Sequence, residues 1–300
     1  MANTVRIKRR ASGNAGAPTS LANAELAYNE VDDVLYYGKG TGGAGGTATS
    51  IPAIGGPGAY LTLSTAQTVS GNKTFTGSVD LTGSNATAEA IDLVRRADAA
   101  GATSHLQVAP YYNKPSQEGL FRHFSAIARE TDRPIVLYSI PGRCGVEIAV
   151  ETVVRLRAAH ANIVGIKEAG GSVEKAGRLV RELDPGFTVL SGDDALTVAF
   201  AEFGAQGIVS VASNLIPAEI TRLANLCREG NLPEARNLHI RLADLFKVLF
   251  VEPNPVPVKH LLARAGIIGS AEVRLPLCEM SAANRAAVEA TADAFLANRR

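Results

Sequence analysis

Two hydrophobic patterns alternate along residues 86–230 of this chain. Short apolar runs, rich in β-branched residues, are each followed by a longer stretch whose apolar positions recur at helical spacing. Residues 86–100 show the second pattern, with charged residues opposite the apolar ones and Gly101 as a stop. This first stretch predicts an amphipathic helix.

The strand and helix patterns then repeat together five times. The predicted strands are residues 106–109, 134–139, 163–167, 187–191 and 207–211, and the helices that follow them are 117–130, 150–159, 173–183, 195–203 and 217–229. Such an alternation requires parallel strands joined by crossovers, which predicts a (β/α) barrel or a doubly wound sheet. Three more helices, at 235–247, 256–265 and 282–297, have no strand between them.

Residues 1–84 have a different composition. They are rich in Gly, Thr and Ser, and short strands are predicted at 5–8, 34–37, 61–63, 67–69 and 73–75, with a strand or helical turn at 21–28. Residues 38–58 are a Gly/Ala/Thr/Pro tract with too few large side chains to offset its ordering entropy, so a flexible loop or linker is expected. We therefore predict three parts: a leader (1–84), a partial barrel (85–230) and a helical region (231–300).

The leader carries a resemblance of its own. The segments LSTAQTVSGNKTFTGSVDLTGS and IKRRASGNAGAPTSLANAELAYNEVDDVLYYGKG are similar to the N-terminal parts of phage tail fibre proteins. A disordered leader is the alternative interpretation, because Gly/Thr-rich segments recur by composition alone.

Net charge and cysteine content limit the classes of function that fit this chain. The formal net charge of +1 gives no global field that would recruit nucleic acid. The three cysteines are widely spaced and form no CxxC pair, which indicates a reducing compartment and no structural zinc site. No apolar run is long enough for a membrane span and the N-terminus lacks a secretory apolar region, so a cytoplasmic protein is expected.

Candidate chemistry collects where the predicted strands end. Lys167 ends the run Ile163–Ile166, Tyr138 lies near the end of the preceding strand, and Arg143 follows soon after. An amine beside apolar walls has a lowered pKa and can attack a carbonyl, while phenols relay protons and a guanidinium binds carboxylates. Asp193 is adjacent to a second aspartate, but adjacent side chains point apart, so no metal site is expected.

Six segments in order resemble the dihydrodipicolinate synthase family, within the pyruvate-dependent class I aldolases and lyases. They cover residues 84–300 and read PYYNKPSQEGLFRHF, VLYSIPGRCG, IVGIKEAGG, VLSGDDAL, GIVSVASN and FVEPNPVPVK. The resemblance implies a lyase of lysine biosynthesis that condenses pyruvate with aspartate semialdehyde, without a cofactor and as a homo-oligomer. N-acetylneuraminate lyase and 2-keto-3-deoxy sugar acid aldolases remain alternatives.

The resemblance also implies catalytic roles for individual residues. Lys167 would form the Schiff base with pyruvate, and Tyr138 would relay protons to and from that adduct. Tyr112 would extend the relay across a subunit contact, and Arg143 would bind the carboxylate of the semialdehyde.

Further positions are assigned to binding by the same resemblance. Backbone groups near Gly192 and Val209 would line the pyruvate pocket. Asn85, Glu89 and Tyr111 match positions that bind lysine as a feedback inhibitor in some members of the family.

One departure from the family opposes the enzyme interpretation. The family's GTTGE motif, whose threonines hold the pyruvate carboxylate and link two tyrosines, does not occur in this sequence. About five of eight β/α units are predicted, and such an incomplete TIM-type barrel would leave the strands starting near His105 and ending at Val211 as open edges. A non-catalytic chimera or virion structural protein is therefore the second hypothesis.

Overall fold

The computed structural model describes residues 8–10, 26–29, 34–37, 53–55 and 79–297. The chain divides into two compact units, Met1–Phe75 and Thr76–Arg300. In the first unit a four-stranded sheet has the order β1 (Lys8–Arg10), β2 (Leu26–Asn29), β3 (Val34–Tyr37) and β4 (Ala53–Gly55). The pair β1–β2 is parallel, and β2–β3 and β3–β4 are antiparallel.

Several predictions for the leader can be compared with this sheet. The strand predicted at 34–37 is confirmed as β3, and the strand or helical turn predicted at 21–28 overlaps β2 at residues 26–28. Of the strand predicted at 5–8, the structure describes Lys8, the first residue of β1. The tract 38–58 was predicted to be a loop, but its residues Ala53–Gly55 form β4 on β3. A ladder uses only backbone groups, so small residues are able to form it once a partner strand is present. The strands predicted at 61–63, 67–69 and 73–75 lie outside the described residues.

The second unit contains a parallel sheet of six strands in sequential order. The strands are β5 (Val79–Leu81), β6 (Ser104–Val108), β7 (Ile135–Ser139), β8 (Ile163–Glu168), β9 (Thr188–Ser191) and β10 (Gly207–Ile208). The intervening helices are α1 (Thr87–Ala99), α2 (Gln117–Ala128), α3 (Pro141–Cys144), α4 (Val150–Ala159), α5 (Val173–Glu182), α6 (Thr197–Glu202) and α7 (Pro217–Arg228), with the 3₁₀ turns η1 (Asp194–Leu196) and η2 (Ala212–Asn214).

Strand β5 corrects the predicted count of five. It pairs in parallel with β6, with Leu81 opposite Leu106, so the strand near His105 is flanked on both sides and is not an edge. Among the described residues β5 and β10 have one neighbour each. The sequence analysis missed β5 because three residues containing Asp80 are too few to show a period of two. The six parallel strands and their helices form part of a (β/α) barrel.

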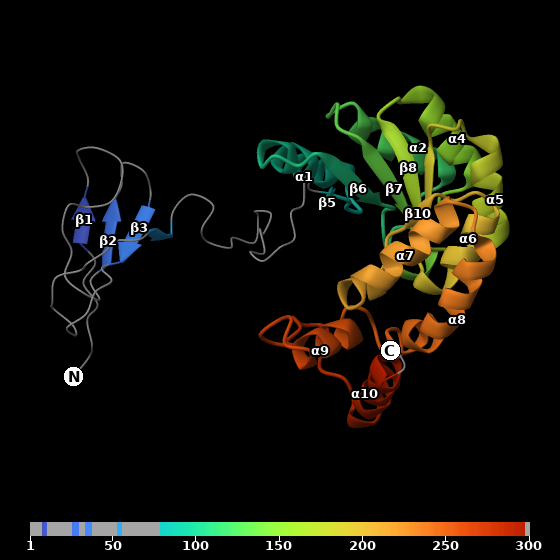
Figure 1. The fold of residues 1–300 in the computed structure, drawn as a ribbon. Coiled ribbons are helices and arrows are strands. Elements are labelled where there is room, and N and C mark those ends of the chain that lie inside the picture. Colours follow the sequence, from blue (N-terminus) through green and yellow to red (C-terminus); the bar gives the residue numbers. More distant parts are fainter. Residues whose placement is uncertain (1–7, 11–25, 30–33, 38–52, 56–78, 298–300) are drawn as a thin grey trace, which may run out of the picture. The chain divides into compact units, whose positions relative to one another are not determined.

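The two faces of this sheet are packed differently (Figure 1). The helix face consists of alternate strand positions that are buried against α2, α4 and α5, such as Ile135 and Leu137. The open face consists of the intervening positions, which are only half-buried: Leu106, Val108, Val136, Tyr138, Lys167, Thr188 and Leu190. Leu81, on the same face of β5, is 60% exposed. An incomplete barrel shows this asymmetry because its interior has no facing strands.

The last helices pack together at one end of the second unit. They are α8 (Leu232–Val248), α9 (Val256–Arg264) and α10 (Ala282–Ala297), close to the predicted ranges. Their apolar faces share one core cluster with α7, including Leu223, Leu242 and Val288. No described helix is long and apolar enough to span a membrane.

Candidate functional site

The site is built on the carboxyl ends of the neighbouring strands β7 and β8. Tyr138 and Lys167 are direct partners in the parallel register, so both side chains project from the open face. The Lys167 Nζ lies 4.0 Å from the centroid of the Tyr138 ring. The amine and the phenol predicted from the sequence are therefore brought together by strand pairing.

The surroundings of Lys167 favour its neutral form. Burial, and to a smaller extent the positive charge of Arg143, lower the pKa of this amine to about 8, while Asp194 opposes the shift. Burial raises the pKa of Tyr138, and Arg143 acts against that change. A half-buried lysine with this pKa is in part a free amine near neutral pH, as a carbonyl nucleophile requires.

Gly192 and Val209 follow directly after the next two strands of the sheet, β9 and β10. The Gly192 N–H donates to the carbonyl of Glu168 over 2.8 Å, and the Val209 N–H donates to the carbonyl of Ser191 over 2.8 Å. A Cβ on Gly192 would lie 3.1 Å from the Lys167 Cε and 2.6 Å from the Ala169 Cβ. Glycine at this position therefore leaves room for the lysine side chain.

Asp194 is a site residue that the sequence analysis considered only as a metal ligand. It is buried, and its carboxylate accepts hydrogen bonds from the Ser210 hydroxyl, the Val211 N–H at 2.9 Å and the Ala212 N–H at 3.2 Å. These bonds fix the loop after β10. Among the described residues no group of three metal-binding side chains is found. In the sequence, Asp194 is marked by its position just after a predicted strand. That position does not show which groups donate hydrogen bonds to its carboxylate.

Arg143 lies on the short helix α3, which follows β7 directly. Its side chain is exposed, and its Nη2 donates a long hydrogen bond of 3.4 Å to the carbonyl of Asn254. Its charge acts on both Lys167 and Tyr138, as their pKa shifts show. An exposed cation is thus placed close to Lys167 and Tyr138.

Residues 50–295 match the family model described as "Dihydrodipicolinate synthetase family". The chain belongs to this family. The match starts inside the predicted leader, and it gives no support to the resemblance of residues 1–84 to phage tail fibre proteins.

Individual family members resemble the chain over about two thirds of its length. A 4-hydroxy-tetrahydrodipicolinate synthase from Sulfurihydrogenibium sp. is 48% identical over 203 residues, which are 68% of this chain and 69% of that protein. The solved structure of the enzyme from Methylacidiphilum fumariolicum SolV is 54% identical, with a TM-score of 0.70 over 72% of each chain. That of the enzyme from Cyanidioschyzon merolae with lysine bound is 40% identical, with a TM-score of 0.69 over 72% of this chain and 73% of that one.

Tyr111 and Tyr112 lie in the loop after β6. Tyr112 has a positive φ of 74° and is 88% exposed, and its N–H donates to the carbonyl of Cys144 over 3.2 Å. Within one chain it is therefore not packed against Tyr138. The left-handed backbone is uncommon for a tyrosine and turns this side chain outward.

The three residues assigned to lysine binding lie near this loop. The Asn113 side chain donates to the carbonyl of Asn85 over 2.9 Å, which joins the start of α1 to the Tyr111 loop. Glu89 is exposed and accepts a hydrogen bond of 2.5 Å from the Ser84 hydroxyl. The fold thus brings the segments of Asn85, Glu89 and Tyr111 to one region.

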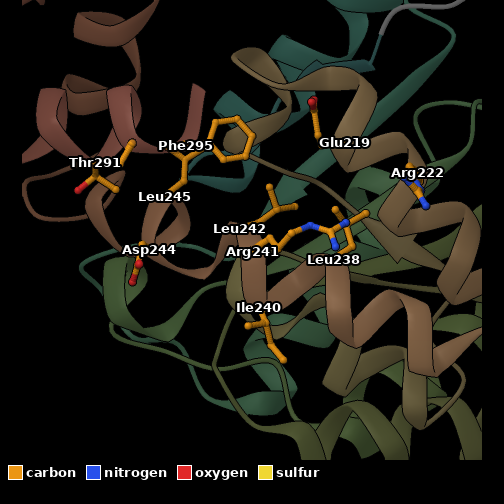
Figure 2. Close-up of a pocket in the computed structure, with 11 residues that line it drawn as sticks. Glu219, Arg222, Leu238, Ile240, Arg241, Leu242, Asp244, Leu245, Thr291 and Phe295 are labelled. Carbon is orange, nitrogen blue, oxygen red and sulfur yellow. The ribbon is translucent and has the colours of Figure 1, made fainter. Parts of the chain in front are cut away.

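A separate hollow of about 590 Å³ lies among the last helices (Figure 2). Side chains of α7, α8 and α10 line it, among them Arg222, Arg241 and Phe295. None of its lining residues comes from a strand or from the family motifs around Lys167. It therefore has no part in the site.

Proposed function

We propose that this chain condenses pyruvate with L-aspartate 4-semialdehyde to give 4-hydroxy-tetrahydrodipicolinate, through a Schiff base on Lys167. The observation that carries the proposal is the half-buried amine of Lys167, with a pKa of about 8, 4.0 Å from the ring of Tyr138. The names of the related enzymes support the choice of substrates.

Each side chain has a role in the proposed reaction. The Lys167 amine adds to the keto carbon of pyruvate, and water leaves to give an iminium. Loss of a methyl proton gives an enamine, whose carbon attacks the aldehyde of the second substrate and restores the iminium. The amino group of that substrate then adds to the iminium carbon, which closes the ring and releases the Lys167 amine. Tyr138 relays the protons, with Tyr112 of a neighbouring subunit extending the relay. Arg143 binds the carboxylate of the semialdehyde with its planar fork.

The remaining assignments belong to the same proposal. The backbone near Gly192 and Val209 lines the pyruvate pocket, since Gly192 adjoins the Lys167 side chain. Lysine binds as an inhibitor beside Asn85, Glu89 and Tyr111, supported by the lysine-bound relative. We place this activity in the cytoplasm, in a homo-oligomer. Each chain has a leader (1–84), whose strand β5 joins the sheet of the catalytic region (85–230), and a helical region (231–300).

Reductive trapping tests the nucleophile. Incubation with pyruvate and sodium cyanoborohydride should add one reduced pyruvyl group, on Lys167 and on no other lysine, as read by peptide mass spectrometry. Consumption of aspartate semialdehyde by the untrapped protein then tests the second substrate. Labelling of other lysines in a folded sample would refute the assignment of Lys167.

The non-catalytic hypothesis is favoured by two observations. The sequence has no GTTGE motif, and the described sheet has six strands where a closed TIM barrel has eight. A folded, monodisperse chain that forms no adduct with pyruvate would support this second candidate.

A further inference from the structure

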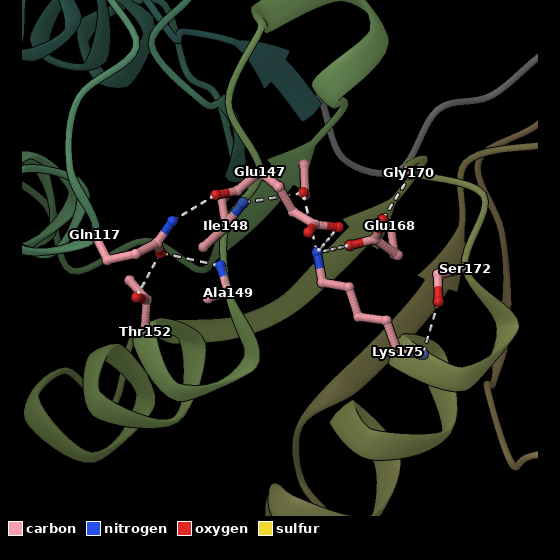
Figure 3. Close-up of polar contacts among 10 residues, drawn as sticks. Gln117, Glu147, Ile148, Ala149, Thr152, Glu168, Gly170, Ser172 and Lys175 are labelled. Carbon is pink, nitrogen blue, oxygen red and sulfur yellow. Dashed lines mark hydrogen bonds and ion pairs between the residues drawn. The ribbon is translucent and has the colours of Figure 1, made fainter.

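Three buried polar side chains, those of Ser139, Glu168 and Lys175, lie on the helix face of the sheet, behind the two site residues. Figure 3 shows Lys175 and Glu168 with their polar contacts. Ser139 follows Tyr138 in β7, and Glu168 follows Lys167 in β8, so both point away from the site. Lys175 of α5 reaches them from the covering helix. Ser139 and Glu168 are 0% exposed and Lys175 is 8% exposed.

The ammonium of Lys175 contacts both strands. Its Nζ lies 2.7 Å from Glu168 Oε2 and donates to Ser139 Oγ over 3.3 Å. It also donates to Glu147 Oε1 over 2.9 Å. Ser139 and Glu168 are direct partners in the β7–β8 register. One ammonium therefore joins two strands at the residues next to Tyr138 and Lys167.

We propose that Lys175 is a positioning residue for the reaction on Lys167. Its ammonium ties Glu168 to Ser139 and so fixes the separation between the Lys167 amine and the Tyr138 ring on the other face. We call Lys175, Glu168, Ser139 and Glu147 the Lys175 clamp. This inference rests on the proposed function.

The loop that follows Glu168 is built around the clamp. The Gly170 N–H donates to Glu168 Oε1 over 2.6 Å. A Cβ on Gly170 would lie 2.6 Å from that oxygen and 3.2 Å from Glu147 Oε1, so a larger residue there would displace the two carboxylates. The Ser172 hydroxyl accepts from the Lys175 N–H over 3.1 Å and caps α5, which orients the lysine.

Gln117 of α2 supports the outer side of the clamp. Its Nε2 donates to the carbonyl of Glu147 over 2.8 Å, and its Oε1 accepts from the Ala149 N–H at 3.0 Å and the Thr152 hydroxyl at 2.7 Å. The segment that carries Glu147 is therefore held by a second helix. An ammonium fixed on three sides by oxygen atoms has little freedom to move.

A gain in stability is a weak explanation for the charged side chains of the Lys175 clamp. Taking charges out of water costs free energy, and apolar residues of similar volume commonly stabilise a core as well as a buried ion pair does. Burial raises the pKa of Glu168, although Lys175 acts against this shift, which shows that desolvation is not fully offset. A polar clamp at this point is better explained by the geometry that it imposes on β7 and β8.

The test compares Lys175→Met with the neutral double variant Lys175→Met/Glu168→Gln. The control is Arg178→Met, which removes a half-buried cation of the same helix, paired with Glu151 and Glu182. For each folded protein the rate of pyruvate trapping on Lys167 is measured with cyanoborohydride. The pH midpoint of Lys167 acetylation by acetic anhydride is measured without pyruvate.

We expect the double variant to melt close to the parent but to trap pyruvate at least ten-fold more slowly. Its Lys167 midpoint should rise towards that of an ordinary lysine, because one charge of each sign is removed together and only the exposure of the amine changes. Arg178→Met should match the parent in both measurements. The single variant should in addition lose stability, because Glu168 is left without its cation.

The two proposals fail in different ways. If the double variant traps pyruvate as fast as the parent and its Lys167 titrates at the same pH, Lys175 has only a structural role. The proposal that Lys175 positions the site is then overturned. If the parent itself forms no adduct with pyruvate, the proposed function fails. The acetylation midpoint then decides the clamp: a shift in the double variant supports it, and an unchanged midpoint overturns it.

Discussion

The two faces of the six-stranded sheet differ in packing and in chemistry. The helix face is buried and apolar, apart from a few polar positions that include the Lys175 clamp. The open face is half-buried and carries Lys167 and Tyr138. Because side chains alternate along a strand, each site residue has a neighbour on the opposite face. In the proposed role of the Lys175 clamp, the face that stabilises the fold also positions the side chains of the face that carries the chemistry.

The same comparison explains why the reactive amine lies on the less packed face. A fully buried ammonium costs too much free energy, and a fully exposed one keeps its ordinary pKa. Lys167 lies between these limits, with a pKa of about 8. Partial burial therefore gives a nucleophile without loss of access for a substrate.

The largest effect is expected from Lys167→Met. Trapping of pyruvate should be lost completely, because among the described residues only the Lys167 amine is found over a tyrosine ring. The free energy of unfolding at pH 7 should rise by about 1–2 kcal/mol, since a half-buried ammonium is removed. Peptide mass spectrometry and urea unfolding measure the two results. The exposed Lys247→Met is the control, and loss of trapping there would contradict the assignment.

A matched pair of leucines compares the faces directly. Leu137 on the helix face is 0% exposed, whereas Leu106 on the open face is half-buried. Leu137→Ala should cost about 2–5 kcal/mol, as core truncations do. Leu106→Ala should cost about 1–2 kcal/mol, because less apolar surface returns to water. Equal losses in chemical denaturation would mean that the two faces are packed alike.

The pH dependence of trapping tests the electrostatics of the open face. With a Lys167 pKa of about 8, the free-amine fraction should raise the trapping rate roughly 50-fold from pH 6 to pH 8 and then level off. The folded pKa lies below the ordinary 10.5, so the unfolded state binds more protons between pH 8 and 10.5. The contribution of Lys167 to stability should therefore rise with pH across that window. A trapping rate that keeps rising to pH 10 would indicate an ordinary lysine.

The smallest effect is expected from Arg143→Lys. The charge is kept, so the pKa of Lys167 and the rate of pyruvate trapping should change little. The planar fork is lost, so KM for the semialdehyde should rise roughly ten-fold, as for one charge-assisted hydrogen bond. Steady-state kinetics and trapping measure the two steps, with Arg122→Lys on α2 as a surface control. Equal loss in both steps would show that Arg143 is structural.

Much of the second unit could be predicted from local pattern. The periodicity predicted α4 and α10 with their observed bounds, and it placed Lys167 at the end of a buried strand. The family resemblance, carried by six ordered segments, was confirmed by the match over residues 50–295. These features could be predicted locally, because the spacing of apolar side chains within one segment indicates whether it forms a helix or a strand.

The sequence by itself determined the alternation of strands and helices, the family and the candidate nucleophile. Only the tertiary structure decided that Val79–Leu81 joins the sheet, that Gly192 adjoins the Lys167 side chain, and that Lys175 bridges Ser139 and Glu168. Each of these depends on contacts between segments far apart along the chain. Neither composition nor spacing encodes such contacts until strand register and helix packing bring the side chains together.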